Sequence, residues 1–257
     1  MLLPNGRRDA LRQVGLFLGA YLLYQLVRGQ VNADGAPERA AWNATRIIDL
    51  ERALHVFVEP RIEQWALGFH ALMEITTWFY INGNYAITGG VLLWIYARRN
   101  GSFYCVRNMF MIAMVLALVG YALYPTAPPR LMPQWGFTDA VQLYSGISAQ
   151  HGAPAMFLNL YAAVPSMHVC FALMSGLSMV RLSSRLLAQL AWALYTPFVV
   201  FVVITTGNHY LTDCVLGMLT AGLSALIADQ LLARVRPDAW SFERSAGGLP
   251  EMTSPAT

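Results

Sequence analysis

Two short polar motifs in an apolar background organise this 257-residue chain. The first is Val164-Pro165-Ser166-Met167-His168, and the second is Gly207-Asn208-His209-Tyr210-Leu211-Thr212-Asp213. The apolar sequence between them is long enough to cross a membrane twice, because a bilayer core about 30 Å thick needs about 20 helical residues per crossing. Both motifs are therefore expected at the same membrane face.

The first motif predicts a helix that begins at Pro165. Proline is well tolerated in the first turn of a helix, where its missing N–H is not needed. Val164 cannot cap this turn, so the backbone N–H groups of Ser166, Met167 and His168 are expected to point out of the helix end. A helix start of this kind binds anions. We therefore predict that it contacts a negatively charged substrate.

The second motif places His209 four residues before Asp213. On a helix, this spacing stacks two side chains on one face, about 5–6 Å apart at Cβ. The carboxylate could then hold one ring nitrogen and leave the other to attack or bind. Two histidines at neighbouring helix mouths, one of them backed by a carboxylate, indicate phosphate-transfer chemistry.

These motifs resemble those of the type-2 phosphatidic acid phosphatase superfamily, whose members carry Pro-Ser-x-His at one helix start and His-x-x-x-Asp at a later one. Within that superfamily, Tyr124-Pro125-Thr126-Ala127-Pro128-Pro129-Arg130 and Asn208-His209-Tyr210 look like the inositol phosphorylceramide synthase branch. The resemblance covers residues 45 to 230 and implies a helical bundle that acts on lipids in the membrane, without a cofactor or metal.

The resemblance also implies a role for each motif residue. His209 would attack phosphorus to give a phosphohistidine, and Asp213 would fix its tautomer. His168 would protonate the leaving oxygen and then deprotonate the acceptor. The predicted substrate-binding residues are Arg130, Ser166, Met167, Asn208 and Tyr210, of which Arg130 and the helix-start N–H groups would stabilise the phosphoryl oxygens.

The chain departs from the simple phosphatases of that superfamily at three positions. Leu123 stands where they have a lysine, Leu131 where they have a proline, and Val203 where they have an arginine. The loss of two cations favours a diester, whose phosphate carries less charge than that of a monoester. We therefore expect transfer of a phosphorylated head group, such as inositol phosphate, between lipids. The alternative is a phosphatase that hydrolyses a lipid phosphate or a polyprenyl diphosphate.

Three other interpretations of the same residues remain. His168, His209 and Asp213 could be ligands of a zinc ion, which accepts imidazole and carboxylate and leaves one position open. Ser166 could be a nucleophile, although it lacks the sharp elbow in which a serine nucleophile sits. Both histidines could also be core residues of a catalytically silent membrane bundle.

The composition indicates an integral membrane protein. Hydrophobic residues make up 56% of the chain and charged residues 12%, whereas soluble domains average about 45–50% and about 25%. A net charge of +3 spread over short loops offers no basic stripe, so no nucleic acid is expected to bind. We predict one catalytic domain over residues 1–237 and a disordered cytoplasmic tail over 238–257. The oligomeric state does not follow from the sequence.

The arginine distribution predicts six membrane spans, because arginines accumulate in cytoplasmic loops. Residues 71–98 form either one kinked helix or two short spans, and one helix places ten arginines on the same side. This choice puts both termini in the cytoplasm and the motifs on the extracytoplasmic side of the plasma membrane. The predicted spans are 13–28, 71–98, 103–124, 165–181, 186–205 and 209–233.

Two segments outside the spans are expected to surround the site. Ile47, Leu50 and Leu54 recur at helical spacing, while Asp49 and Glu51 fall on the other side. This amphipathic pattern predicts a helix lying in the membrane interface, followed after Pro60 by a short helix over residues 63–69. In the loop over residues 125–163, the prolines at 125, 128, 129 and 133 predict an extended path that fixes where Arg130 points.

Overall fold

The computed structural model describes residues 4–30, 36–145 and 161–232, and the regular structure within these ranges is helical. The predicted all-α fold is confirmed. In chain order the elements are α1 (Gly6–Gln30), α2 (Ala36–Ala53), α3 (Glu59–Leu67), α4 (His70–Trp78), a π-helical segment (Phe79–Gly83), α5 (Asn84–Arg98), α6 (Asn100–Leu123), two 3₁₀ turns (Pro129–Leu131 and Pro133–Trp135), α7 (Ala140–Ser145), α8 (Met167–Leu182), α9 (Leu186–Thr205), α10 (Leu211–Leu226) and a second π-helical segment (Ile227–Leu232).

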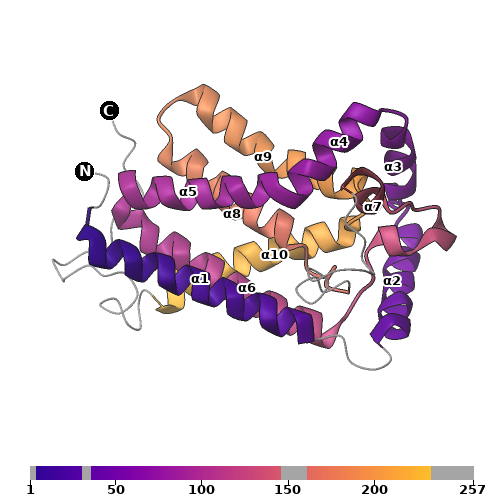
Figure 1. Ribbon diagram of the computed structural model, residues 1–257, viewed down its shortest axis with the longest axis horizontal. Coiled ribbons are helices and arrows are strands. Elements are labelled where there is room, and N and C mark those ends of the chain that lie inside the picture. The colour runs from indigo at the N-terminus through magenta and orange to yellow at the C-terminus, as the bar shows by residue number, and fades with distance from the viewer. Residues whose placement is uncertain (1–3, 31–35, 146–160, 233–257) are drawn as a thin grey trace.

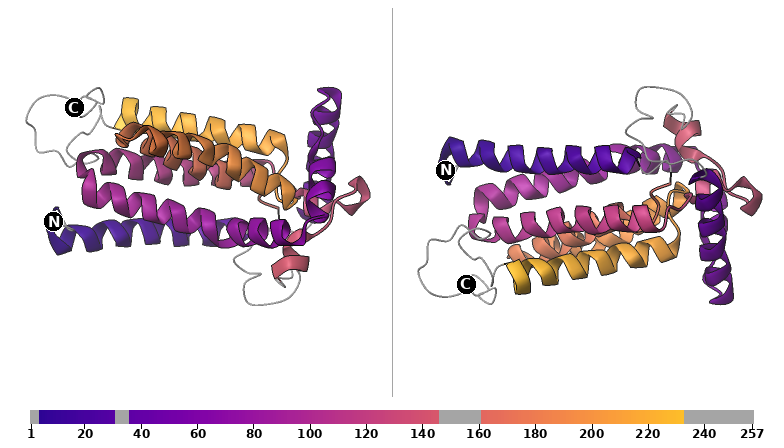
Figure 2. Two further views of the ribbon diagram at one scale, coloured as in Figure 1. Left: turned by 90° about the horizontal axis from the view of Figure 1, so that it is seen from above. Right: turned by 90° about the horizontal axis from the view of Figure 1, so that it is seen from below.

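The long helices form a bundle with a collar at one end. Helices α1, α5, α6, α8, α9 and α10 run alongside one another, whereas α2 stands across their direction (Figure 2). The starts of α1, α6 and α9 lie at the end opposite α2, α3 and α7 (Figure 1). We call α2 and α3 the collar. The site motifs, which begin α8 and precede α10, lie at the collar end.

Within the described ranges, three helical stretches are long and apolar enough to cross a membrane, namely Asn100–Leu123, Leu186–Thr205 and Leu211–Gln230. They identify an integral membrane protein. Helix α8 is apolar but spans only 16 residues, and α5 spans 15. The six-span arrangement therefore stays a prediction.

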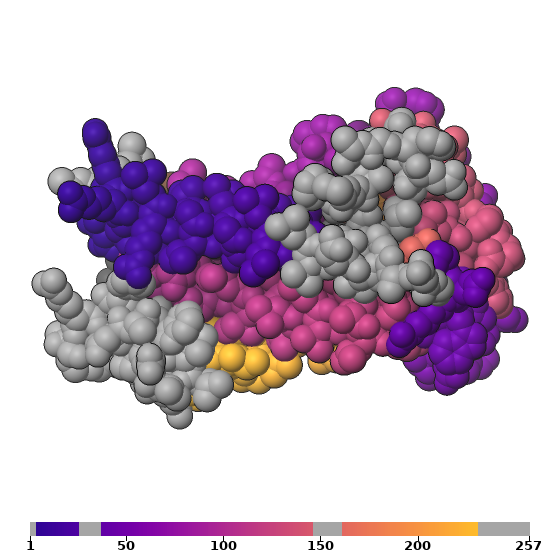
Figure 3. All heavy atoms as spheres, turned by 60° about the horizontal axis from the view of Figure 1, so that its bottom comes forward, coloured from indigo at the N-terminus to yellow at the C-terminus, as the bar shows by residue number. Residues whose placement is uncertain are grey.

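Polar residues near the start of α1 are hydrogen-bonded to residues of α5 and α6. The Tyr96 hydroxyl donates to Asp9 Oδ2 at 2.8 Å, and Arg107 Nη1 donates to Gln13 Oε1 at 2.5 Å. These bonds tie α1 to α5 and α6. The remaining outer surface of α1 and α6, which lie against each other in Figure 3, exposes large aliphatic side chains suited to lipid. They are Leu11, Val14, Leu18, Leu22, Val115 and Val119.

Residues 70–98 form one continuous helical path. Helix α4 leads through the π-helical segment into α5, and the backbone of Trp78, Phe79, Gly83 and Asn84 stays in the right-handed helical region. The single kinked helix that the sequence predicts over residues 71–98 therefore contains a π-helical turn, which is a common cause of a sharp bend. Gly83 accommodates it because a Cβ there would lie 2.5 Å from the Phe79 ring.

The collar differs in part from its prediction. Its first helix ends at Ala53, and the second begins at Glu59 and ends at Leu67, so the predicted range 63–69 is wrong. Leu50 and Leu54 are 49% and 61% exposed, which suits an interfacial helix. Glu51, however, is fully buried rather than on the solvent face. The physical reason is that Glu51 has a backbone N–H partner inside the protein.

The segment after α6 is not extended throughout. Pro129 and Pro133 each open a 3₁₀ turn, which suits proline because the first turn needs no N–H from it. Asp139 Oδ1 accepts the Gln142 N–H at the start of α7. Thr126 N–H donates to the Tyr161 carbonyl at 2.7 Å, so residues 125–127 run beside the segment that precedes α8. The predicted tail, 238–257, lies outside the described residues.

Candidate active site

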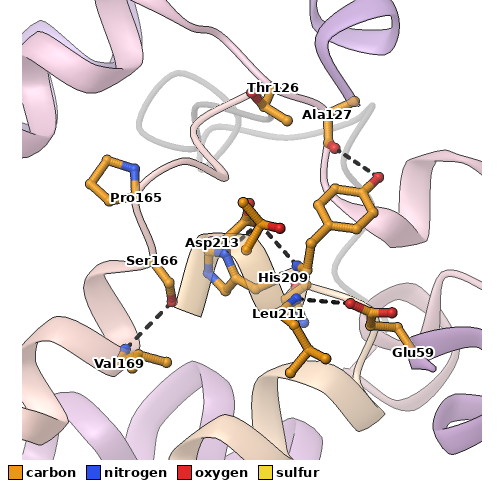
Figure 4. A network of polar contacts seen from close by, with 12 residues as sticks. Glu59, Thr126, Ala127, Pro165, Ser166, Val169, His209, Leu211 and Asp213 are labelled. Atoms are coloured by element: carbon orange, nitrogen blue, oxygen red, sulfur yellow. Dashed lines mark hydrogen bonds and ion pairs between the residues drawn. The ribbon is translucent and has the colours of Figure 1, made fainter. Parts of the chain in front are cut away.

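Helix α8 begins two residues later than the sequence predicts. Met167 is its first residue and Ser166 its N-cap, with Ser166 Oγ accepting the Val169 N–H at 3.4 Å (Figure 4). The prediction of Pro165 as the first helical residue is wrong because a serine side chain caps a helix better than valine. The Ser166 N–H is also engaged, since it donates to the Asp213 carbonyl at 3.1 Å. The N–H groups of Met167 and His168 lie in the first turn of the helix.

The start of α8 packs directly against α10. A Cβ on Gly217 would collide with the Ser166 carbonyl, and a Cβ on Gly120 would lie 2.8 Å from the Pro165 ring. Small residues on α6 and α10 therefore allow the close approach that brings the two motifs together. The Met167 side chain is buried in the apolar core beside Phe171 and Tyr121. Only its backbone lies where a substrate could meet it.

The His168 ring is fixed by the π-helical region of the chain. Its Nε2 lies 3.1 Å from the Tyr80 carbonyl, its ring stacks on Tyr80 with centroids 4.3 Å apart, and Tyr85 meets it edge-on at 5.1 Å. Because a carbonyl only accepts, Nε2 carries a proton and Nδ1 is the nitrogen that gains or loses one. Tyr80 and Tyr85 were not predicted from sequence, because aromatic residues within an apolar span give no distinctive signal.

His209 lies in the loop before α10 and not on the helix. Helix α10 begins at Leu211, and Asp213 is its third residue. Asp213 Oδ2 accepts the Tyr210 N–H at 3.0 Å and lies 3.4 Å from His209 Nδ1. The predicted contact between histidine and carboxylate therefore exists, but its geometry comes from a helix cap rather than from a shared helical face. Asp213 is fully buried.

Gly207 shapes the loop that carries His209. Its φ is +63°, a conformation that side chains disfavour, and a Cβ there would lie 2.7 Å from Glu63 Oε1. The Gly207 carbonyl accepts the Arg130 N–H at 2.7 Å. This loop, which carries His209, therefore lies against Glu63 of α3 and against the turn that contains Arg130.

The two histidine rings lie next to each other. Their centroids are 6.0 Å apart, with exposed fractions of 8% for His168 and 5% for His209. One phosphoryl group placed between them could contact both rings. Asp213 Oδ2 lies beside Nδ1 of His209, on the opposite side of the ring from Nε2. The structure thus brings together the three predicted catalytic residues.

Arg130 sits at the edge of this pair in a network of its own. Nε donates to Asn208 Oδ1 at 3.1 Å, and Nη1 donates to both carboxylate oxygens of Asp139, at 3.2 and 3.0 Å. Asn208 Nδ2 in turn donates to the carbonyl and hydroxyl of Thr206. Asp139 was not predicted. A carboxylate nine residues after the predicted phosphate-binding arginine was the available signal.

Two predicted substrate-binding side chains have partners within the protein instead. The amide of Asn208 is used by Arg130 and Thr206. The Tyr210 ring is fully buried, and its hydroxyl donates to the Ala127 carbonyl at 3.3 Å. These contacts connect the His209 loop to Arg130 and to Ala127, and the role of both side chains in substrate binding stays a prediction.

Three buried glutamates of the collar reach the same region. Glu59 Oε1 accepts the Leu211 N–H at 2.8 Å, Glu51 Oε1 accepts the Thr212 N–H at 2.7 Å, and Glu63 accepts the Thr138 N–H at 3.2 Å. All three are fully buried. Burial raises the pKa of Glu63 to about 7, with the Asp139 charge adding to the effect. The spacing of Glu59 and Glu63, four residues apart, was the sequence signal for one acidic helix face.

The zinc interpretation gains no support from the geometry. Within residues 4–30, 36–145 and 161–232, no three or more His, Cys, Asp or Glu side chains are arranged to hold a metal ion. Asp213 Oδ2 is engaged with His209 and the Tyr210 N–H. The donor set therefore fits a histidine–carboxylate pair better than a shared metal.

Comparison with known proteins assigns the chain to a family through residues 45–227. No curated protein and no solved structure shows significant similarity to it. A family model described as the PAP2 superfamily matches residues 45–227. This match extends from the collar through α10 and includes both histidine motifs and Arg130. It gives no support to a specific inositol phosphorylceramide synthase branch. Because the match covers more than half of the sequence, the chain belongs to the PAP2 superfamily.

Proposed function

We propose that the protein transfers a phosphoryl-containing group of a membrane lipid through a phosphohistidine on His209. The observation that carries the proposal is the contact of His209 Nδ1 with Asp213, because it directs Nε2 toward attack. The Nε2 lone pair forms a bond to phosphorus while the bond to the leaving oxygen breaks. Membership of the PAP2 superfamily supports this chemistry, since its members are generally phosphatases or phosphotransferases.

His168 supplies the proton in this scheme. With Nε2 donating to the Tyr80 carbonyl, Nδ1 delivers its proton to the leaving oxygen as the first bond breaks. In the second step, the acceptor hydroxyl returns a proton to Nδ1 and attacks phosphorus, and the phosphorus–nitrogen bond breaks. Stacking on Tyr80 keeps the ring in one orientation through both steps.

Charge on the phosphoryl oxygens is stabilised by Arg130 and the start of α8. The guanidinium fork matches phosphate geometry, and the N–H groups of Met167 and His168 lie at a helix end that favours anions. Asp139 offsets part of the Arg130 charge. A site with one partly neutralised cation suits a phosphodiester better than a dianionic monoester.

We propose further that the acceptor is a lipid alcohol rather than water, so that a phosphorylated head group, for example inositol phosphate, passes between lipids. Three features support transfer: both histidines are more than nine-tenths buried, the collar packs over the site, and Leu123 and Val203 replace two cations of the simple phosphatases. Excluding water protects a reactive intermediate from hydrolysis.

The test follows a labelled phospholipid incubated with the purified protein, with and without candidate lipid alcohols. Transfer predicts label in a new lipid only when an alcohol acceptor is present. Release of head-group phosphate at one rate whatever acceptor is added would leave a lipid phosphatase. Loss of activity in EDTA and its recovery with zinc would instead revive a metal mechanism. A protein that forms no phosphohistidine and turns over no lipid phosphate would be a silent bundle.

We also propose six spans, with both termini cytoplasmic and the histidines on the extracytoplasmic side of the plasma membrane. Single cysteines placed at Gln142, near the collar, and at Asn100 or Ser183, at the opposite end of the bundle, test this orientation. An impermeant thiol reagent applied to intact cells should label Gln142→Cys and neither of the others. Labelling of Asn100→Cys would refute the arrangement.

A further inference from the structure

Carboxylates of the collar hold the start of α10. Glu59 Oε1 accepts from Leu211 N, and Glu51 Oε1 accepts from Thr212 N, the first two N–H groups of the helix. Figure 4 shows Glu59 reaching this helix start beside His209 and Asp213. Because Leu211 and Thr212 lie between these two residues in sequence, a shift of either glutamate moves the backbone that sets the His209–Asp213 contact.

The two carboxyl groups are neighbours at this helix start, because they accept from two consecutive backbone N–H groups. Both glutamates are fully buried, and within the described residues the Oε2 atom of each has no hydrogen-bond partner. No arginine in this part of the chain lies within ion-pair distance of either. Two touching carboxylates without a cation cannot both stay ionised. A single proton between them satisfies both orphan oxygens.

We propose that Glu51 and Glu59 share one proton and act as a positioning pair that holds the start of α10, and thereby His209, in the geometry for attack on phosphorus. This inference rests on the proposed function. The other titratable groups facing the pair are Tyr210, Asp213 and Cys214 on the loop and helix opposite. These groups are neutral or negative, so loss of the shared proton adds repulsion that loosens the collar from α10.

The pair predicts that activity decreases at high pH, which gives the pH profile of activity a basic limb. Burial, the contact with Glu59 and its charge raise the pKa of Glu51 to about 8. The shared proton is therefore present at neutral pH and leaves as the pH rises through about 8. Turnover should fall over that range because the collar then releases the backbone beside His209.

The experiment compares kcat and KM against pH for the wild type, Glu51→Ala and Glu51→Gln with a short-chain phospholipid as donor and a saturating lipid alcohol as acceptor. Glu51→Ala should lose kcat at least about tenfold with little change in KM, because positioning acts on the reacting geometry. Glu51→Gln should restore most of this loss, because its amide donates permanently to Glu59 and its oxygen still accepts from Thr212. It should also move the basic limb up by about one pH unit or more. Asp49→Asn, an exposed carboxylate on the same helix, is the matched control.

A stability measurement separates this inference from the proposed function. Between the unfolded pKa of 4.5 and about 8, the folded protein binds the extra proton, so its Tm should fall as the pH rises and then level off. The fall should be smaller in Glu51→Gln by about 3 °C or more. A wild type that is inactive but differs from Glu51→Gln in this fall of Tm would refute the proposed function and still support the Glu51–Glu59 pair. An identical fall in both proteins, or an unchanged basic limb in Glu51→Gln, would overturn the pair.

Discussion

The start of α8 beside His168 takes its side-chain cap from Ser166, whereas the start of α10 beside His209 has a local cap in Asp213 and two more from far along the chain. Glu59 and Glu51 reach α10 from 152 and 161 residues away. The helix start beside the proposed acid is thus capped without the collar, while the helix start beside the proposed nucleophile is held by it. Changes in the collar should therefore reach His209 and leave His168 in place.

The largest effect should come from the two histidines themselves. His209→Ala should lower kcat by about 10⁴-fold or more, because no other group forms the covalent intermediate. His168→Ala should lose about as much with a lipid substrate, but much less with an aryl phosphate, whose leaving group needs no proton. Steady-state kinetics on both substrates measure the difference.

Retained fold in both variants, checked by size-exclusion chromatography and thermal unfolding, is the control. Equal losses for the two variants on the aryl substrate would contradict the separate roles. Trapping of acid-labile, base-stable phosphate on His168→Ala but not on His209→Ala would identify the phosphorylated ring directly.

A smaller effect is expected at Arg130, which contacts the loop that precedes α10 through Gly207 and Asn208. Arg130→Ala should lower kcat/KM by about 10²- to 10³-fold, the usual cost of removing one donor to a developing anion. Asp139→Asn keeps the shape of the network but removes the charge that offsets the guanidinium. It should tighten inhibition by vanadate, a mimic of the transferring phosphoryl group. Weaker vanadate binding in Asp139→Asn would mean that Asp139 only orients Arg130.

The sequence predicted the features that rest on local chemistry. Hydropathy indicated a helical membrane protein, the order of the motifs indicated the superfamily, and the spacing of His209 and Asp213 indicated a contact that the structure contains. The start of α8 was predicted wrongly at Pro165, although Ser166 is itself a favoured N-cap residue. Weighing the serine as a cap, instead of the proline as the first helical residue, would have corrected it.

Features that rest on tertiary contacts could not be predicted. Glu51 looked like a solvent-facing charge on an amphipathic helix, because nothing in the sequence near residue 51 announces an N–H partner at Thr212. Asn208 and Tyr210 lie inside a site motif, which favoured substrate contact. Their partners, Arg130 and the Ala127 carbonyl, come from a loop about 80 residues earlier. Such pairings appear only when the helices are packed.

A third prediction concerns Glu63, the collar carboxylate that supports the Asp139 loop instead of α10. Its pKa is raised to about 7 from an ordinary 4.5, so the folded state binds more protons between these values and stability falls as the pH rises through them. Glu63→Gln should remove a fall of up to about 3 kcal/mol. Thermal unfolding between pH 4.5 and 8 measures it.

Outside that window, Glu63→Gln should leave the slope of stability against pH unchanged. A pH profile of unfolding like that of the wild type would show that Glu63 is ionised in the folded protein. In that case the collar would hold the Asp139 loop through a charged carboxylate.

The smallest effect should follow from removing the local cap. Ser166→Ala should cost about 1 kcal/mol of stability, the usual value for losing an N-cap side chain. It should change kcat less than threefold, because the Tyr80 carbonyl and ring still hold His168.

Glu59→Ala removes a cap of the same kind from α10, but it also leaves Glu51 without its partner and frees the backbone next to His209. Its loss of kcat should therefore exceed that of Ser166→Ala by about tenfold. Tm and kcat measured in parallel for the two variants test this difference. If both variants lost equal stability and equal kcat, the two helix starts would be supported alike. The collar would then not position the nucleophile.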